Sequence, residues 1–295
     1  MDVRRDPLSG EVVIVAEGRA DRPFVYSVAA PALPSSVADC PFCEGNEGLT
    51  PPEVARVGPG EPDTPGWRIR VVPNKYPIVA PPDGVHEVVM LSPAHDHDLA
   101  ALDHEQRRLV WRMMRDRCAR HLESGFPYVT AFVNHGRAAG ASIEHPHAQV
   151  VALGFEPPSV TAAGVRAITS TATNLVLDGA VLAWCPSVPV WTFETIVARP
   201  DSGPFHESSD AALDGVSDTV HDMLNRLLRT IGHAPYNVVV HTATEAPSWY
   251  VQIVPRLGVR AGFEFATDVS VTVVPPEQAA ELLRDAAEQP DRRSS

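Results

Sequence analysis

The sequence is poor in the features that mark secreted, membrane-embedded and nucleic-acid-binding proteins. It has only four cysteines in 295 residues, too few for the disulfide framework of a small secreted protein. No run of about twenty apolar residues occurs, and the first residues contain no apolar signal core. A formal net charge of −13 excludes a general nucleic-acid surface, because phosphate backbones are bound by basic stripes. We therefore expect a cytoplasmic protein without a membrane or nucleic-acid partner.

The chain does have enough apolar material for a large core. Hydrophobic residues make up 44% of the sequence, and its length exceeds the roughly 100–200 residues of a typical domain. The 29 prolines, about twice the usual frequency, punctuate loops. One large duplicated domain and two closely packed halves are both consistent with this length.

Two stretches have the pattern of amphipathic helices. The first begins with a capping-box-like sequence at residues 103–106 and ends before Gly125. The second has apolar residues at helical spacing from Leu213 to Ile231 and ends at Gly232. Further runs predict strands at residues 12–16, 67–72, 87–91, 129–133, 150–153 and 194–198, and a short helix at residues 276–288.

The most informative stretch is residues 129–153, where two β-rich runs flank a loop of Gly, Ala and Ser. Such small side chains let backbone N–H groups approach an anion closely, which predicts a phosphate-binding loop. If the second run begins at residue 145, the period of two places His145, His147 and Gln149 on one face of a strand. Two imidazoles and an amide would then point together at the loop.

The chemistry of these side chains suggests group transfer. A neutral imidazole is a good nucleophile toward activated phosphorus, and the phosphoryl-imidazole that it forms can pass the group on. His147 is the candidate nucleophile. The Gln149 amide can donate a hydrogen bond to a phosphoryl oxygen but cannot carry a proton to or from water at neutral pH, which favours a bound acceptor over hydrolysis. Two surface histidines beside a turn are the simpler alternative.

The combination of Asn134-x-Gly136, residues 139–142 and His145-Pro-His147-Ala-Gln149 resembles the galactose-1-phosphate uridylyltransferase family, the transferase branch of the histidine-triad superfamily. The hydrolase relatives carry a third histidine where this chain has Gln149. The resemblance implies an α+β fold of two fused histidine-triad-like halves, residues 1–155 and 156–295, each with antiparallel strands and one long helix. It also implies a homodimer.

Cys40-Pro-Phe-Cys43 is a C-x2-C knuckle, which is half of a tetrahedral zinc site. The family resemblance implies that the shell around one structural zinc ion is completed by two histidines, giving the ligands Cys40, Cys43, His95 and His145. His97 is the rival to His95, and a pair of free reduced cysteines is the alternative. A closed shell is structural, and it would fix the strand that carries His147.

The resemblance also implies substrate contacts outside the motif. Arginines after the first strand would lie near substrate phosphates, and the Pro-Asn-Lys turn after residue 72 would contact base, ribose or phosphate. Solvated loop arginines and an ordinary Pro-Asn turn are the alternatives. The predicted substrate-binding residues are Arg19, Arg22, Asn74, Lys75, Asn134, Gly140 and Ser142, and the predicted catalytic residues are His147 and Gln149.

Past the central motif the chain repeats itself weakly, with a helix, a Pro-Tyr pair and a strand in the same order. Residues 248–256 fall where the histidine motif fell. Gln252 aligns with Gln149, whereas Ser248 and Tyr250 stand where histidines would be. The second half is therefore expected to keep the scaffold and to lack the nucleophile.

Together, these features predict a two-step nucleotidyl exchange. His147 would attack the α-phosphorus of a nucleotide sugar, UDP-glucose by resemblance, and a sugar phosphate, galactose 1-phosphate in the named family, would then take the nucleotide. Relatives with this motif use ADP-sugars or dinucleoside polyphosphates with inorganic phosphate as acceptor, and the altered C-terminal motif leaves that possibility open. A nucleotide-binding sensor without turnover is the alternative from a different functional class.

Overall fold

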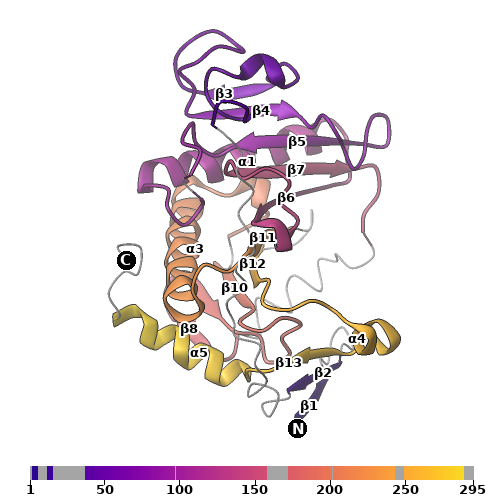
Figure 1. The fold of residues 1–295 in the computed structure, drawn as a ribbon, viewed down its shortest axis with the longest axis vertical. Helices are drawn as coiled ribbons and strands as arrows, with labels where there is room; N and C mark the ends of the chain where they lie inside the picture. The colour runs from indigo at the N-terminus through magenta and orange to yellow at the C-terminus, as the bar shows by residue number, and fades with distance from the viewer. Residues whose placement is uncertain are drawn as a thin grey trace.

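The computed structural model describes residues 2–5, 12–15, 37–96, 98–157, 172–200, 202–242 and 249–288. Its main feature is a ten-stranded antiparallel sheet with two long helices along one face (Figure 1). In spatial order its strands are β3 (Ala55–Val57), β4 (Ile69–Pro73), β5 (Gly84–Met90), β7 (His147–Leu153), β6 (Tyr128–His135), β11 (Tyr236–His241), β12 (Tyr250–Pro255), β10 (Thr195–Ala198), β9 (Leu182–Trp184) and β8 (Leu175–Leu177). A three-stranded sheet contains β1 (Asp2–Arg5), β2 (Val12–Val15) and β13 (Ser270–Thr272). The expected α+β class is confirmed.

The two long helices begin and end close to where the sequence pattern predicts. In α1 (His104–Glu123) the Asp103 side chain accepts a hydrogen bond from the N–H of Gln106. In α3 (Asp210–Ile231) Ser209 caps the first turn and Gly232, at φ 77°, follows the last. The other α-helices among the described residues are α4 (Gly262–Thr267) and α5 (Pro276–Asp285), of which α4 was not predicted. Among the described helices, none combines the length and the apolar character of a transmembrane segment.

The order of strands along the sheet is mirrored about its centre. Strands β5, β7 and β6 occupy one side of the β6–β11 pair, and β10, β12 and β11 occupy the other in the reverse order. The pairing register repeats as well, because Gln149 lies opposite Val88 and Phe132, and Gln252 lies opposite Ile196 and Val239. The boundary between residues 155 and 156 stays a prediction, since one sheet runs through both parts.

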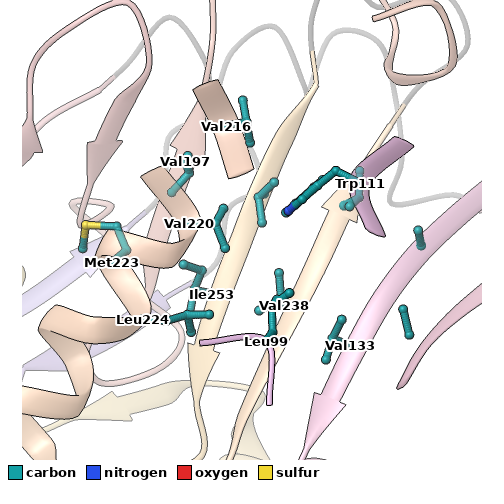
Figure 2. Close-up of a cluster of buried hydrophobic side chains, with 14 of the residues drawn as sticks. Leu99, Trp111, Val133, Val197, Val216, Val220, Met223, Leu224, Val238 and Ile253 are labelled. Atoms are coloured by element: carbon teal, nitrogen blue, oxygen red, sulfur yellow. The ribbon is translucent and has the colours of Figure 1, made fainter. Parts of the chain in front are cut away.

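The core lies between the helix-covered face of the sheet and the two long helices. Alternate residues of each strand point to opposite faces, so β6 places Val133 on the core side and Asn134 on the other. Figure 2 shows Val220 and Leu224 of α3 facing Ile253 of β12 in this core. The buried positions of α3 follow the apolar spacing of the sequence, whereas α1 buries Gln106, Arg107 and His121 along with its apolar residues. The opposite face of β4 to β7 carries polar side chains such as His86 and Gln149 beside apolar ones such as Val88.

A buried ionic cluster ties β5 to α1. The Glu87 carboxylate accepts hydrogen bonds from the guanidinium of Arg117, at 2.8 Å from Nε, and lies 3.1 Å from His121 Nε2. Burial alone would raise the pKa of Glu87, but the hydrogen bonds from His121 and Arg117 outweigh it and hold the pKa below its ordinary value of 4.5. Glu87 therefore holds β5 against the helix, while its neighbours in the strand face the other way.

Replacing Glu87 with glutamine should lower the free energy of unfolding by about 3 kcal/mol at pH 7, because it leaves a buried guanidinium without a counter-charge. Since the folded pKa is lowered, the stabilisation is complete above the unfolded value of 4.5 and disappears as pH falls through the folded value. Denaturant unfolding of the wild-type and Glu87→Gln proteins at pH 7 and pH 4 measures the difference between their free energies of unfolding. Glu105→Gln, at an exposed ion pair with Arg68, is the control with a small effect. A larger difference at pH 4 than at pH 7 would contradict a stabilising role of the ionised Glu87 carboxylate.

Candidate active site

A cavity of about 510 Å³ lies on the face of the sheet opposite the helices, lined by residues of β4, β5, β6 and β7. The alternation of the strands brings their polar residues together here. Of the nine predicted catalytic and substrate-binding residues, seven line this cavity, namely Asn74, Lys75, Asn134, Gly140, Ser142, His147 and Gln149. The other two, Arg19 and Arg22, lie outside the described residues. Lys75 is the one cationic side chain among the described residues that line the cavity.

His147 is held as a neutral imidazole with a defined tautomer. Its Nδ1 lies 2.8 Å from the carbonyl oxygen of His145, and because a carbonyl only accepts, Nδ1 carries the proton. Burial lowers the pKa of His147, and the ring of Phe42 packs against it at 5.3 Å between centroids. The lone pair is therefore on Nε2, which is the state that a nucleophilic imidazole requires.

Gln149 follows on the same face of β7, and its side-chain oxygen lies 2.8 Å from Nε2 of His86. His86 is a cavity-lining residue that the sequence reasoning missed, because the predicted strand began at residue 87 whereas β5 begins at Gly84. With the strand extended, His86 and Val88 alternate with Glu87 and fall on the cavity face. This two-residue alternation is the signal that would have identified it.

The loop after β6 is a tight turn, and its backbone donors are used internally. The N–H groups of Ala139 and Ala141 donate to the carbonyl of Gly136, and that of Gly140 donates to Arg137. Gly136 and Gly140 have φ of 80° and 90°, which explains the small residues. The expectation that the loop offers its backbone N–H groups to an anion is therefore wrong for these three. Ser142 and Gly140 are the loop residues predicted to bind substrate that line the cavity.

A residue of the second half holds this loop in place. The Asn237 side-chain nitrogen on β11 donates to Asn134 Oδ1 and to the carbonyl of Ala139, both at 2.8 Å. Gly136 packs against Pro235, which a Cβ at this position would approach to 3.0 Å. The two parts of the chain are thus joined directly beside the candidate site.

His145 does not share the cavity face with His147 and Gln149, which corrects the sequence expectation of a three-residue face. Strand β7 begins at His147, after Pro146, which has no N–H for the ladder and whose carbonyl accepts from Leu91 N–H. His145 is fully buried, and its Nε2–H donates to the carbonyl of Ser92 at 2.7 Å. Its free Nδ1 points instead at the sulfur of Cys43, 3.5 Å away.

Four potential metal ligands meet at this point. Their ligand atoms all lie within 4.8 Å of one another, and they belong to Cys40, Cys43, His95 and His145. His95 Nδ1 is 3.2 Å from Cys43 Sγ, close to the roughly 3.5 Å between nitrogen and sulfur ligands of one tetrahedral zinc ion. Burial, and then the neighbouring Cys40, raise the pKa of the Cys43 thiol to about 12, and burial lowers the pKa of His145 to about 4. A cation would stabilise the thiolate and neutral-imidazole forms. His97, the rival ligand, lies outside the described residues.

Known proteins that this chain resembles were found by sequence and by structure. The family model for the N-terminal domain of galactose-1-phosphate uridyl transferase matches residues 70–157. A galactose-1-phosphate uridylyltransferase of Streptomyces lividans is 33% identical over 162 residues, which cover 53% of this chain and 39% of that protein. An ADP-glucose phosphorylase of Arabidopsis thaliana is 28% identical over 329 residues, which cover 96% of this chain and 92% of that protein.

Over residues 70–157 this chain is therefore similar to the galactose-1-phosphate uridylyltransferase family. A crystal structure of the Arabidopsis thaliana ADP-glucose phosphorylase with bound ADP-glucose has a TM-score of 0.83 at 25% identity and covers 96% of this chain and 98% of that one. A uridylyltransferase structure, at a TM-score of 0.70 and 22% identity, shows the same fold over 97% of this chain. The matched residues include β7, so the family motif and the cavity coincide.

Asn237→Ala should loosen the loop at residues 136–142, because Asn134 Oδ1 and the Ala139 carbonyl both lose their donor. We expect about 1–3 kcal/mol less stability and faster hydrogen exchange in residues 136–142. Asn237→Asp has the same shape but presents only acceptors to these oxygens, so its loss should be larger. Mass-spectrometric hydrogen exchange checks both, and an unchanged exchange rate in this loop would show that Asn237 does not hold it.

Proposed function

We propose that this chain is a nucleotidyltransferase that moves a nucleotidyl group from a nucleotide sugar to a phosphate-bearing acceptor through a covalent intermediate on His147. The observation that carries the proposal is the tautomer of His147, whose Nδ1–H is bound to a backbone carbonyl so that Nε2 keeps its lone pair at the cavity. Gln149 and Ser142 stand beside it as hydrogen-bond donors for the non-bridging oxygens.

In the first step, the His147 Nε2 lone pair forms a bond to the α-phosphorus. The bond from that phosphorus to the bridging oxygen breaks, its electron pair stays with the oxygen, and the sugar 1-phosphate leaves as an anion that needs no proton. The imidazole ring becomes cationic, and its Nδ1–H bond to the His145 carbonyl becomes stronger. The protein thus stabilises the intermediate without moving a proton.

In the second step, an oxygen of the acceptor phosphate attacks the same phosphorus and the P–N bond breaks. The electron pair returns to Nε2, so the ring is again neutral with its proton on Nδ1. The amide of Gln149 cannot act as a general base for water, which favours an acceptor that is already an anion. Lys75 at the cavity supplies a positive charge for such an acceptor or for the donor phosphates.

ADP-glucose as donor and inorganic phosphate as acceptor are the substrates best supported. The protein named ADP-glucose phosphorylase is similar over 96% of this chain, and its structure with bound ADP-glucose superposes over nearly all of it. UDP-glucose with galactose 1-phosphate is the second candidate, supported by the family model and by the 33% identity to a uridylyltransferase.

We further propose that Cys40, Cys43, His95 and His145 hold one structural zinc ion. The bound ion would fix both the knuckle and His145. Phe42, between the two cysteines, contacts the His147 ring, and the His145 carbonyl holds His147 Nδ1. Loss of the ion should therefore disturb the nucleophile through two contacts. The homodimer stays a prediction.

Intact-mass measurement after mixing the protein with ADP-glucose or UDP-glucose tests the transfer. The wild-type protein should gain the mass of an adenylyl group, which is AMP less one water, with ADP-glucose, and inorganic phosphate should then remove this group with release of ADP. His147→Asn should gain nothing, whereas His104→Asn, at an exposed histidine of α1, should be labelled normally. Labelling by UDP-glucose and removal by galactose 1-phosphate would support the second candidate. Tight nucleotide binding without any mass gain would contradict both and favour a sensor.

Replacing Cys43 with alanine should remove the metal. Elemental analysis of the purified wild-type protein should give about one zinc per chain, and that of Cys43→Ala close to none, with slower formation of the covalent label. Cys118→Ala is the matched control, because Cys118 is a buried thiol in the core outside the cluster. Equal zinc content in the two variants would refute the site.

A further inference from the structure

We propose that His86 is a positioning residue that fixes the orientation of the Gln149 side-chain amide, so that its NH2 group and not its oxygen faces the cavity. This inference rests on the proposed function, since it assigns a reason for the donor at the phosphoryl site. His86 does not need to touch substrate for this role. It acts through Gln149, its neighbour across the β5–β7 pair.

The protonation of the His86 ring follows from its partners. The backbone N–H of Ile78 points at His86 Nδ1 at 3.0 Å, and a backbone N–H only donates, so Nδ1 carries no proton. The Asn74 side-chain nitrogen lies 3.4 Å from the same Nδ1 and 3.1 Å from Nε2, and the Asn74 oxygen accepts from Tyr76 N–H. A neutral imidazole without a proton on Nδ1 carries it on Nε2. His86 is therefore a donor toward Gln149.

The Nε2–H donor of His86 determines which end of the Gln149 amide forms a hydrogen bond within the protein. Nε2–H of His86 donates to Gln149 Oε1 at 2.8 Å, which leaves the NH2 group of Gln149 for the cavity that it lines. An NH2 group stabilises the oxygens of a phosphoryl group, whereas the amide oxygen would repel them. A reversed amide would therefore turn a favourable interaction into an unfavourable one without changing the residue.

The second half of the chain contains the reversed arrangement at the same register. Gln252 stands opposite Ile196 and Val239 as Gln149 stands opposite Val88 and Phe132. Two residues before Ile196 the chain has Glu194, where the first half has His86 two residues before Val88. The residue beside the amide is thus an acceptor in one half and a donor in the other.

Glu194 captures the nitrogen of the second amide. Gln252 Nε2 donates to Glu194 Oε1 at 2.6 Å, and Gln252 Oε1 accepts from His241 Nε2 at 2.8 Å. Each end of that amide has a partner within the protein, whereas no described residue accepts from the NH2 group of Gln149 in the hydrogen bonds of the structure. The chain therefore contains both amide orientations, one beside His86 and one beside Glu194, and these neighbouring side chains account for the difference.

The test replaces His86, the side chain that neighbours Gln149. His86→Glu gives the first half the acceptor of the second, and the rate of His147 labelling by ADP-glucose or UDP-glucose should fall by about 10²–10³-fold, the effect of losing one donor at a developing anion. His86→Gln can offer an oxygen to Ile78 N–H and an NH2 group to Gln149 Oε1, so it should stay within a few-fold of the wild-type rate. Glu194→Gln, which disturbs the corresponding network away from the cavity, should label at the wild-type rate.

A second readout does not depend on turnover. The chain has five glutamines, so selective ¹⁵N labelling gives five side-chain NH2 signals, and Gln149→Glu identifies one of them. In the wild-type protein this signal should shift when ADP or UDP is bound. In His86→Glu it should already be displaced by the carboxylate and respond little to the nucleotide, while calorimetry should show that the protein still binds the nucleotide within about tenfold.

The outcomes separate the two proposals. A wild-type protein that binds nucleotide but is never labelled overturns the proposed function. A labelled wild-type protein overturns the role of His86 alone if His86→Glu is labelled equally fast with an unchanged Gln149 signal, or if Glu194→Gln slows labelling by the same factor. Slow labelling of His86→Glu, rescue in His86→Gln and a displaced signal support both.

Discussion

The site depends on one short hydrogen bond within the chain, from His147 Nδ1 to the carbonyl of His145, at 2.8 Å. It joins a residue at the cavity to a residue in the four-ligand cluster, separated only by a proline. It sets the tautomer of His147, and it offers a carbonyl dipole to the ring if the ring becomes cationic. Because the acceptor is backbone, its direction is fixed by the start of β7 and by the buried ring of His145.

The rest of the structure supplies rigid surroundings for that bond. Glu87 holds β5 against α1 from the core side, while His86 on the same strand reaches Gln149 from the cavity side. Asn237 crosses from the second half to the loop that follows Asn134. Each contact joins elements that are distant in sequence, so the geometry of the cavity reflects the packing of the whole sheet and does not belong to a local motif.

Patterns that depend on near neighbours were readable from the sequence. The caps at Asp103 and Gly232 and the apolar spacing of both helices gave their bounds, since capping and amphipathicity act within one or two turns. The motif also predicted residues that line the cavity, because strand alternation carries His147 and Gln149 to one face. The prediction that His145 shares this face was wrong, because strand pairing begins only after Pro146. Sequence alternation alone cannot show where strand pairing begins. His86 was missed because a strand boundary was misplaced by three residues.

The second half of the chain has the strand arrangement of the first half without its nucleophilic histidine. Tyr250 stands two residues before Gln252, as His147 stands two before Gln149, and its ring stacks on His241 at 4.5 Å. Glu194, Gln252 and His241 are joined in one hydrogen-bond network, in which the Gln252 nitrogen donates to Glu194 and the Gln252 oxygen accepts from His241. Strand β11 carries His241 of that network and pairs with β6, and from the same strand Asn237 holds the loop of the first half. The half without the nucleophile therefore contributes order to the half that has it.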